Sequence, residues 1–212
     1  MIAGPARTAN RTFERLRFNS KHPDRDPVTG ETLAPMPFED SGVGLSAPSG
    51  SPLPSLNIDR VFILSGGDTC SASESVINAL RGINFPVILM GATTCGKPYG
   101  FYPGDNCGTT YFSIQFQGEN EAGFGDYPDG FSPTTNAAAP VGVRVSGCYA
   151  SDDFDHALGD PLERRLALAL AYDQNGCPLV ATNAGQLAVS RTTAAAGALL
   201  SKPYGLTGKI LR

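Results

Sequence analysis

The stretch that decides the fold is RVFILSGGDTCSASESVINALRGINFPVILMGATTCGK, residues 60–97. A short apolar run, Val61 to Leu64, precedes a Gly-rich turn and a helical segment that opens at Ser71. A second apolar run, Pro86 to Met90, leads into a loop that ends at Lys97. Two such runs joined by a segment of helical length predict a parallel βαβ unit. Ligands of open α/β sheets bind beyond the carboxyl ends of the strands, so Ser71 and Lys97 are predicted to face one site.

The composition is typical of a single globular domain. The chain has 212 residues, of which 41% are hydrophobic and 17% are charged, enough to bury one sizeable core. A net charge of -4 argues against a nucleic-acid partner, because phosphate recognition needs a concentrated basic surface. No uninterrupted apolar run approaches the length of a membrane span. We expect no cofactor, and the oligomeric state does not follow from the sequence.

Five cysteines indicate an oxidising compartment. None of them forms a C-x-x-C metal pattern, and five are many for a reducing cytosol; they are Cys70, Cys95, Cys107, Cys148 and Cys177. Cys148 and Cys177 bracket a predicted helix and Cys95 and Cys107 a loop, so we prefer these two pairs and a free Cys70, although spacing does not fix connectivity. The N-terminus lacks the arrangement of a signal peptide, so an exported, periplasmic or cell-envelope protein would carry its leader elsewhere.

The segments around the βαβ unit have weaker patterns. Thr8 to Phe18 predicts an edge strand, and residues 19–57, rich in proline, glycine and serine, predict a long surface insert. Residues 111–117 alternate apolar and polar side chains, which predicts a half-buried strand. Val141 to Val145 predicts a short strand, and residues 179–212 form an Ala-rich tail that is only weakly assignable.

The segment that begins at Asp160 predicts a strong helix. It would open at Asp160 as N-cap with Pro161 in the first turn. Leu162, Leu166 and Leu170 would then form one apolar stripe along it.

Three interpretations of Ser71 and Lys97 compete. In the first, Ser71-x-x-Glu74 is only a capping box for the helix, and Lys97 is a solvated loop lysine. In the second, residues 91–97 match the G-x-x-x-x-G-K pattern of a nucleotide-binding loop. That interpretation fails at Pro98, because a P-loop needs Ser or Thr there to hold magnesium and a helix that begins at this point.

The third interpretation is a serine nucleophile with a lysine base. Serine needs a neighbour to accept its proton, and the two histidines are poor candidates because His22 lies in a loop and His156 beside the acidic run at 152–155. Lysine can be the base where desolvation lowers its pKa, and Lys97 is flanked by apolar and aromatic residues. The helix N-terminus at Ser71 would add N–H groups where an oxyanion develops.

The motifs in this region resemble those of the S41 peptidases, the C-terminal processing or tail-specific protease family. Thr69-Cys70-Ser71-Ala72-Ser73-Glu74 is similar to the family's T-x-S-A-S-E segment, and Thr94-Cys95-Gly96-Lys97 to its lysine loop, with serine and lysine 26 residues apart. Residues 130–133 resemble the later G-[VF]-x-P element and residues 160–163 the D-P-x-L-E helix, one residue shorter. The resemblance covers about residues 60–172, and the Cys-containing motifs resemble a bacterial exported branch.

The resemblance implies a fold, an activity and roles for three residues. The fold would be a ClpP/crotonase-like α/β spiral of small sheets with surrounding helices, and the activity hydrolysis of peptides or proteins. Ser71 would be the nucleophile, Lys97 the general base, and the backbone N–H of Ala72 one oxyanion donor. The chain as a whole, 1–212, would be a partial S41-type protease domain without the PDZ-type domain of many relatives.

Two departures from the family pattern bear on activity. The family often places a glutamine four residues after the lysine to orient it, whereas this chain has Phe101, which leaves Tyr99 or Gln115 as substitutes. The Gly-rich loop that offers the family's second oxyanion donor has no counterpart before Ser71, which predicts an N-terminally truncated and weakly active or inactive chain. The alternative function is a non-catalytic peptidase-like domain that binds extended peptides.

Overall fold

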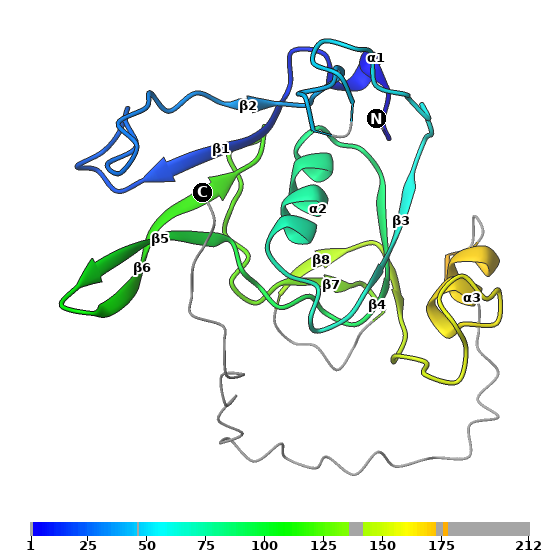
Figure 1. Ribbon diagram of the computed structural model, residues 1–212. Helices are drawn as coiled ribbons and strands as arrows, with labels where there is room; N and C mark the ends of the chain where they lie inside the picture. The colour runs from blue at the N-terminus through cyan, green and yellow to red at the C-terminus, as the bar shows by residue number, and fades with distance from the viewer. Residues whose placement is uncertain (1, 46, 136–141, 173–175, 178–212) are drawn as a thin grey trace. The chain divides into compact units, whose positions relative to one another are not determined.

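The computed structural model describes residues 2–45, 47–135, 142–172 and 176–177 (Figure 1). This part of the chain is a mixed α/β structure of several small sheets and few helices. Its elements, in chain order, are α1 (Pro5–Thr8), β1 (Thr12–Phe18), β2 (Met36–Pro37), β3 (Val61–Ser65), α2 (Ala72–Gly82), β4 (Val87–Gly91), β5 (Tyr99–Asn106), β6 (Thr109–Glu119), β7 (Phe131–Pro133), β8 (Val143–Val145), β9 (Gly147–Tyr149) and α3 (Arg164–Ala171). The predicted tail at 179–212 lies outside the described residues, as does Val141.

The predicted βαβ unit is confirmed. Strands β3 and β4 pair in parallel from Val61 opposite Val87 to Ser65 opposite Gly91, and α2 connects them. Strand β9 pairs in parallel with the other side of β4, which makes β4 the central strand of the order β3-β4-β9. Ser71 and the loop that follows β4 therefore lie at the same edge of this sheet.

Strand β4 is buried on both faces, which explains its uninterrupted apolar sequence. Val87 and Leu89 pack into the cluster that contains Ile77 of α2. Met90, whose side chain points the opposite way, packs into the cluster that contains Leu168 of α3. The two helices thus cover opposite faces of β4, in agreement with their positions in Figure 1.

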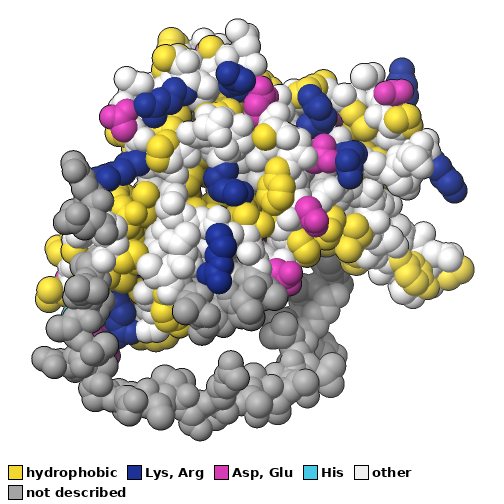
Figure 2. Space-filling model, turned by 180° about the vertical axis from the view of Figure 1, so that it is seen from behind, with side chains coloured by type: hydrophobic (Ala, Val, Ile, Leu, Met, Phe, Trp, Pro, Cys, Tyr) yellow, Lys and Arg dark blue, Asp and Glu magenta, His cyan; other side chains and the backbone are white. Residues whose placement is uncertain are grey.

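A second sheet, in the order β2-β1-β6-β5, covers the other side of α2. The strand predicted within Thr8 to Phe18 forms as β1, but it is not an edge strand. It pairs with β6 on one side and with β2 on the other. Strand β6 forms as predicted, but its alternation does not produce a half-buried strand: Phe112 and Ile114 are 55% and 68% exposed. Figure 2 shows hydrophobic side chains exposed toward the end of this hairpin, at its lower right.

Residues 19–57, the predicted insert, contain β2 and two isolated β-bridges, Arg25 with Thr32 and Ser41 with Pro52. One contact joins this segment to β5: the Tyr102 hydroxyl donates to the buried Asp26 carboxylate at 2.5 Å. This hydrogen bond raises the pKa of Tyr102 to about 12, because ionisation would place two negative charges together.

The helix predicted from Asp160 begins later, at Arg164. Glu163 is its N-cap and accepts a hydrogen bond from the backbone N–H of Leu166 at 2.9 Å. Asp160 instead accepts from the N–H of Leu162, at 2.9 Å, in the turn before the helix. The predicted leucine stripe is also wrong: Leu162 and Leu170 are 69% and 66% exposed, and the leucine buried from this helix is Leu168.

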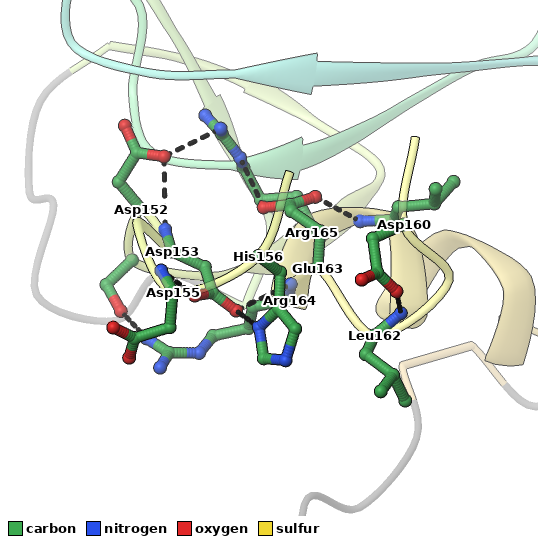
Figure 3. A network of polar contacts seen from close by, with 11 residues as sticks. Asp152, Asp153, Asp155, His156, Asp160, Leu162, Glu163, Arg164 and Arg165 are labelled. Carbon is green, nitrogen blue, oxygen red and sulfur yellow. Dashed lines mark hydrogen bonds and ion pairs between the residues drawn. The ribbon is translucent and has the colours of Figure 1, made fainter. Parts of the chain in front are cut away.

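A polar network surrounds the beginning of α3 (Figure 3). Arg165 forms ion pairs with Asp152 at 2.7 Å and with the buried Glu163 at 3.2 Å. His156 contacts Asp153 at 3.0 Å, and this carboxylate raises the pKa of the imidazole. The network attaches the acidic loop to the helix that covers one face of β4.

Glu163 gives this network a dependence on pH. Burial alone would raise the pKa of Glu163, but hydrogen bonds from Leu166 and Arg165 outweigh it and hold the pKa below its usual value. A carboxylate with a depressed pKa in the folded state contributes stability above its unfolded pKa, and the contribution is lost as the pH falls through the folded value. We expect Glu163→Gln to lower the free energy of unfolding by about 1–3 kcal/mol at neutral pH.

Urea unfolding of both proteins between neutral pH and about pH 3 measures this effect, since the difference should shrink in acid as Glu163 takes up a proton. Glu39→Gln is the matched control, because Glu39 is exposed. A destabilisation by Glu163→Gln that stays constant down to the lowest pH would contradict this role.

Candidate active site

Ser71 lies in a sharp turn between β3 and α2. Its backbone has φ 55° and ψ -114°, a sparsely populated combination for a residue with a side chain. Such strain persists only where the surrounding structure holds it, and it gathers at functional sites. A strained strand-to-helix turn is also how α/β-hydrolases expose their serine nucleophile. The side chain of Ser71 is exposed, as this turn geometry favours.

Glu74 ties this turn to the lysine loop. Its carboxylate is fully buried and accepts four hydrogen bonds from two segments of the chain. The backbone N–H of Ser71 donates at 3.1 Å, which is the glutamate half of the predicted capping box. From the second segment the backbone N–H groups of Gly96 and Lys97 each donate at 2.8 Å, and the Thr94 hydroxyl donates at 2.5 Å. All four partners are donors, which is the environment that a carboxylate anion requires when it is buried.

A disulfide joins the same two segments. Cys70, next to the serine, is bonded to Cys95, and the N–H of Cys95 donates to the carbonyl of Thr69 at 3.0 Å. The expected pair of Cys95 with Cys107 and a free Cys70 are therefore wrong: Cys107 is the free cysteine and is exposed, on the hairpin between β5 and β6. The expected pair of Cys148 with Cys177 is confirmed.

The lysine loop also rests on the segment before β7. The backbone N–H of Thr94 donates to the carbonyl of Phe131 at 3.0 Å, and the Thr94 hydroxyl that binds Glu74 accepts from the N–H of Phe131 at 2.8 Å. Gly96, with φ 79°, crosses this segment so closely that a Cβ would lie 2.0 Å from the carbonyl oxygen of Pro128. A side chain at position 96 would displace the loop that carries Lys97.

These constraints place Ser71 and Lys97 in one pocket. Its volume is about 290 Å³, and it lies between the start of α2, the lysine loop and the sheet formed by β1, β5 and β6. The residues that line it are Glu14, Leu16, Ser71, Ser75, Lys97, Pro98, Tyr99, Gly100, Phe101, Phe116 and Gly118. The prediction that Ser71 and Lys97 face the same site is confirmed, while their chemical roles stay predictions.

The surroundings of Lys97 differ from the expected apolar burial. Its side chain is exposed, and its ammonium lies 5.3 Å from the ring centre of Phe101, the residue in the family's glutamine position. Of the two substitutes expected from the sequence, Gln115 is occupied because its side-chain oxygen accepts from the N–H of Tyr102 at 3.0 Å. Tyr99 lines the pocket beside the lysine.

Ala72 is the first residue of α2, so its N–H belongs to the helix end whose donors have no intrahelical partner. Gly4, Gly42 and Gly44, which precede Ser71 in the chain, do not line the pocket. Neither does His156, which belongs to the network around α3, nor His22. The described residues contain no group of His, Cys, Asp and Glu arranged to hold a metal ion.

The residues that β1 and β6 contribute to the pocket were not predicted: they are Glu14 and Leu16 of β1 and Phe116 and Gly118 of β6. The alternation of side chains along β1 could have indicated Glu14 and Leu16, because both lie on the same face of the strand as the buried Phe18. The second role of Glu74, as the acceptor for the lysine loop, has no counterpart in the capping-box pattern.

Comparisons with known proteins support the fold. No family model and no curated protein matches the chain. Among solved structures, a crystal structure of a candidate S41 protease from Bacteroides fragilis matches with a TM-score of 0.53 and 22% identity, over 80% of this chain and 38% of that one. The chain thus shares a mixed α/β fold with that protein and spans about two fifths of its length. Among the described residues, no helix has the length and apolarity needed to cross a membrane.

We expect Glu74→Gln to destabilise the fold by about 2–3 kcal/mol, because the amide nitrogen would face N–H donors and leave buried groups unpaired. It should also lower the reactivity of Ser71, since the lysine loop would lose its attachment. Urea unfolding and labelling by a serine-directed fluorophosphonate measure the two effects. Glu39→Gln serves again as the exposed control, and wild-type stability and labelling in Glu74→Gln would refute this role.

Proposed function

We propose that this chain is part of a serine endopeptidase of the S41 type that hydrolyses peptide bonds with a Ser71/Lys97 dyad. The observation that carries the proposal is the convergence of an exposed serine, in a strained strand-to-helix turn, and a lysine on one pocket. The other interpretations explain less: a helix cap alone does not require the lysine loop to be bonded to Glu74 and Cys70. The match to the Bacteroides fragilis structure is consistent with this proposal.

The proposed chemistry follows from the positions of these groups. Lys97 in its neutral form takes the proton of the Ser71 hydroxyl, and the serine oxygen attacks the carbonyl carbon of the scissile bond. The N–H of Ala72 donates to the oxyanion, and the lysine then protonates the leaving amine. Water, activated by the same lysine, hydrolyses the resulting ester. Because Lys97 is exposed here, we expect a bound peptide to provide the desolvation that favours its neutral form.

The resemblance to the S41 family also suggests the detailed fold, the domain type and the substrate class. They are a ClpP/crotonase-like spiral of sheets, a partial S41-type protease domain with an insert at 19–57, and peptides or proteins as substrates. We further propose an exported protein, in the periplasm or cell envelope, because two disulfides are stable where thiols are oxidised.

The second candidate function is a non-catalytic domain that binds extended peptides. Phe101 beside Lys97 favours it, because an aromatic ring attracts the protonated lysine and gives it no hydrogen-bond acceptor. Binding alone gives no reason for the strain at Ser71.

Substitution of the dyad separates the two functions. We expect Ser71→Ala to abolish fluorophosphonate labelling and to lower peptide cleavage by roughly 10³-fold or more. Lys97→Arg should do the same, since arginine keeps the positive charge but does not act as a base at accessible pH. Ser73→Ala and Lys21→Ala are matched controls outside the pocket.

The variants are best made both in this chain and in the product of the whole gene. Cleavage by the wild type should rise with pH as the lysine loses its proton, whereas a flat profile would count against a lysine base. Undiminished turnover in Ser71→Ala or Lys97→Arg would exclude the proposed dyad. Peptide binding without labelling or cleavage in the wild type would favour the binding domain.

A further inference from the structure

The pocket that contains Ser71 also contains a carboxylate, that of Glu14. Glu14 of β1 lines the pocket and is half-buried. Its Oε1 atom accepts a hydrogen bond from the hydroxyl of Ser75 at 2.9 Å. Ser75 lies in the first turn of α2, and its backbone N–H donates to the carbonyl of Ser71 at 2.9 Å. The Glu14 carboxylate is thus fixed within reach of a side chain attached to the residue that Ser71 attacks.

The packing around Glu14 keeps space for this carboxylate. Gly118 of β6 lies on the strand next to β1, opposite Leu16. A Cβ at position 118 would lie 2.4 Å from Oε1 of Glu14, so any larger residue would push the carboxylate away. The glycine and the Ser75 hydroxyl together hold Glu14 in its position.

Glu14 has no basic partner among the residues that the structure describes. Two nearby acidic residues do have one: Glu119 at the end of β6 pairs with Arg17 at 2.9 Å, and Glu121, in the turn after β6, pairs with Arg11 at 3.2 Å. Lys97 lines the same pocket, but no ion pair connects it to Glu14. A half-buried carboxylate without a cation retains a desolvation cost that a positively charged ligand would offset.

The remaining walls suit the stem of a long cationic side chain. Leu16, Tyr99, Phe101 and Phe116 present aliphatic and aromatic surface. Lysine and arginine place their methylene groups along such surface while the charged end reaches a polar partner, and arginine also stacks on aromatic rings. A volume of about 290 Å³ lies at the lower limit of small-molecule sites, roughly 300 Å³, which fits one side chain better than a larger ligand.

From this arrangement we infer that Glu14 determines specificity by binding a lysine or arginine side chain of the peptide, on the acyl side of the bond that Ser71 attacks. The inference rests on the proposed function, since it assigns the substrate class of the same site.

Peptides that differ only at this residue test the inference. With lysine and with norleucine, which has a similar length and no charge, we expect kcat/KM to favour lysine by about 10- to 100-fold, the contribution of a hydrogen bond to a charged group. Glu14→Gln should reduce this ratio to about threefold or less, while Glu39→Gln, with the same charge change on an exposed residue, should preserve it.

Binding measured without cleavage keeps this inference separate from the proposed function. In the Ser71→Ala protein, calorimetry with N-acetyl-Ala-Ala-Lys-amide and its norleucine analogue should show the same preference for lysine. A lysine preference in binding without cleavage by the wild type would retain the role of Glu14 and overturn the peptidase.

Other outcomes overturn the role of Glu14. Cleavage with equal kcat/KM for the two peptides would leave the peptidase and remove the specificity. An equal loss of kcat for both peptides in Glu14→Gln, with the ratio unchanged, would show that Glu14 acts on Lys97 instead.

Discussion

The hydrogen bonds to the buried Glu74 carboxylate are the interaction on which the candidate site depends. One glutamate on the first turn of α2 binds the N–H of Ser71 and the N–H groups of Gly96 and Lys97, so it fixes the separation of two loops that leave adjacent strands. A buried anion costs free energy unless donors surround it. The two loops are therefore held together by the need to satisfy one charge, and the Cys70–Cys95 disulfide adds a covalent link at the same place.

The elements around this carboxylate have separate tasks. The β3-β4-β9 sheet brings the two loops to one edge, and the two apolar clusters on either side of β4 fix that sheet. The β1-β6-β5 sheet supplies the floor of the pocket, including Glu14. In the proposed function, the loops of the parallel sheet would carry the serine and the lysine, and the antiparallel sheet would carry the groups that contact the side chain of the peptide.

The parts of the structure that follow from local sequence were predicted well. The βαβ unit and the convergence of Ser71 with Lys97 depend on apolar runs, helix length and the geometry of parallel strands, all visible in residues 60–97. The Cys95 pairing and the contribution of Glu14 depend on contacts between segments distant in sequence. Spacing favoured Cys107 as the partner of Cys95, but the pairing was decided by the approach of the Cys70 turn. The N-cap of α3 was misplaced because Asp160 and Glu163 both have suitable side chains. Burial of Glu163 and its ion pair with Arg165, which no local pattern shows, distinguish the two.

The Cys70–Cys95 bond has a consequence for how this sequence can change over time. Loss of one cysteine leaves the other as an unpaired thiol beside Ser71 or near Lys97, where a sulfur nucleophile would be open to oxidation and stray modification. Loss of both leaves the hydrogen bonds to Glu74 and the backbone hydrogen bond between residues 95 and 69 to hold the loops, and introduces no reactive group. Positions 70 and 95 should therefore be exchanged as a pair, and a relative with cysteine at one of them alone should be rarer than a relative with cysteine at neither.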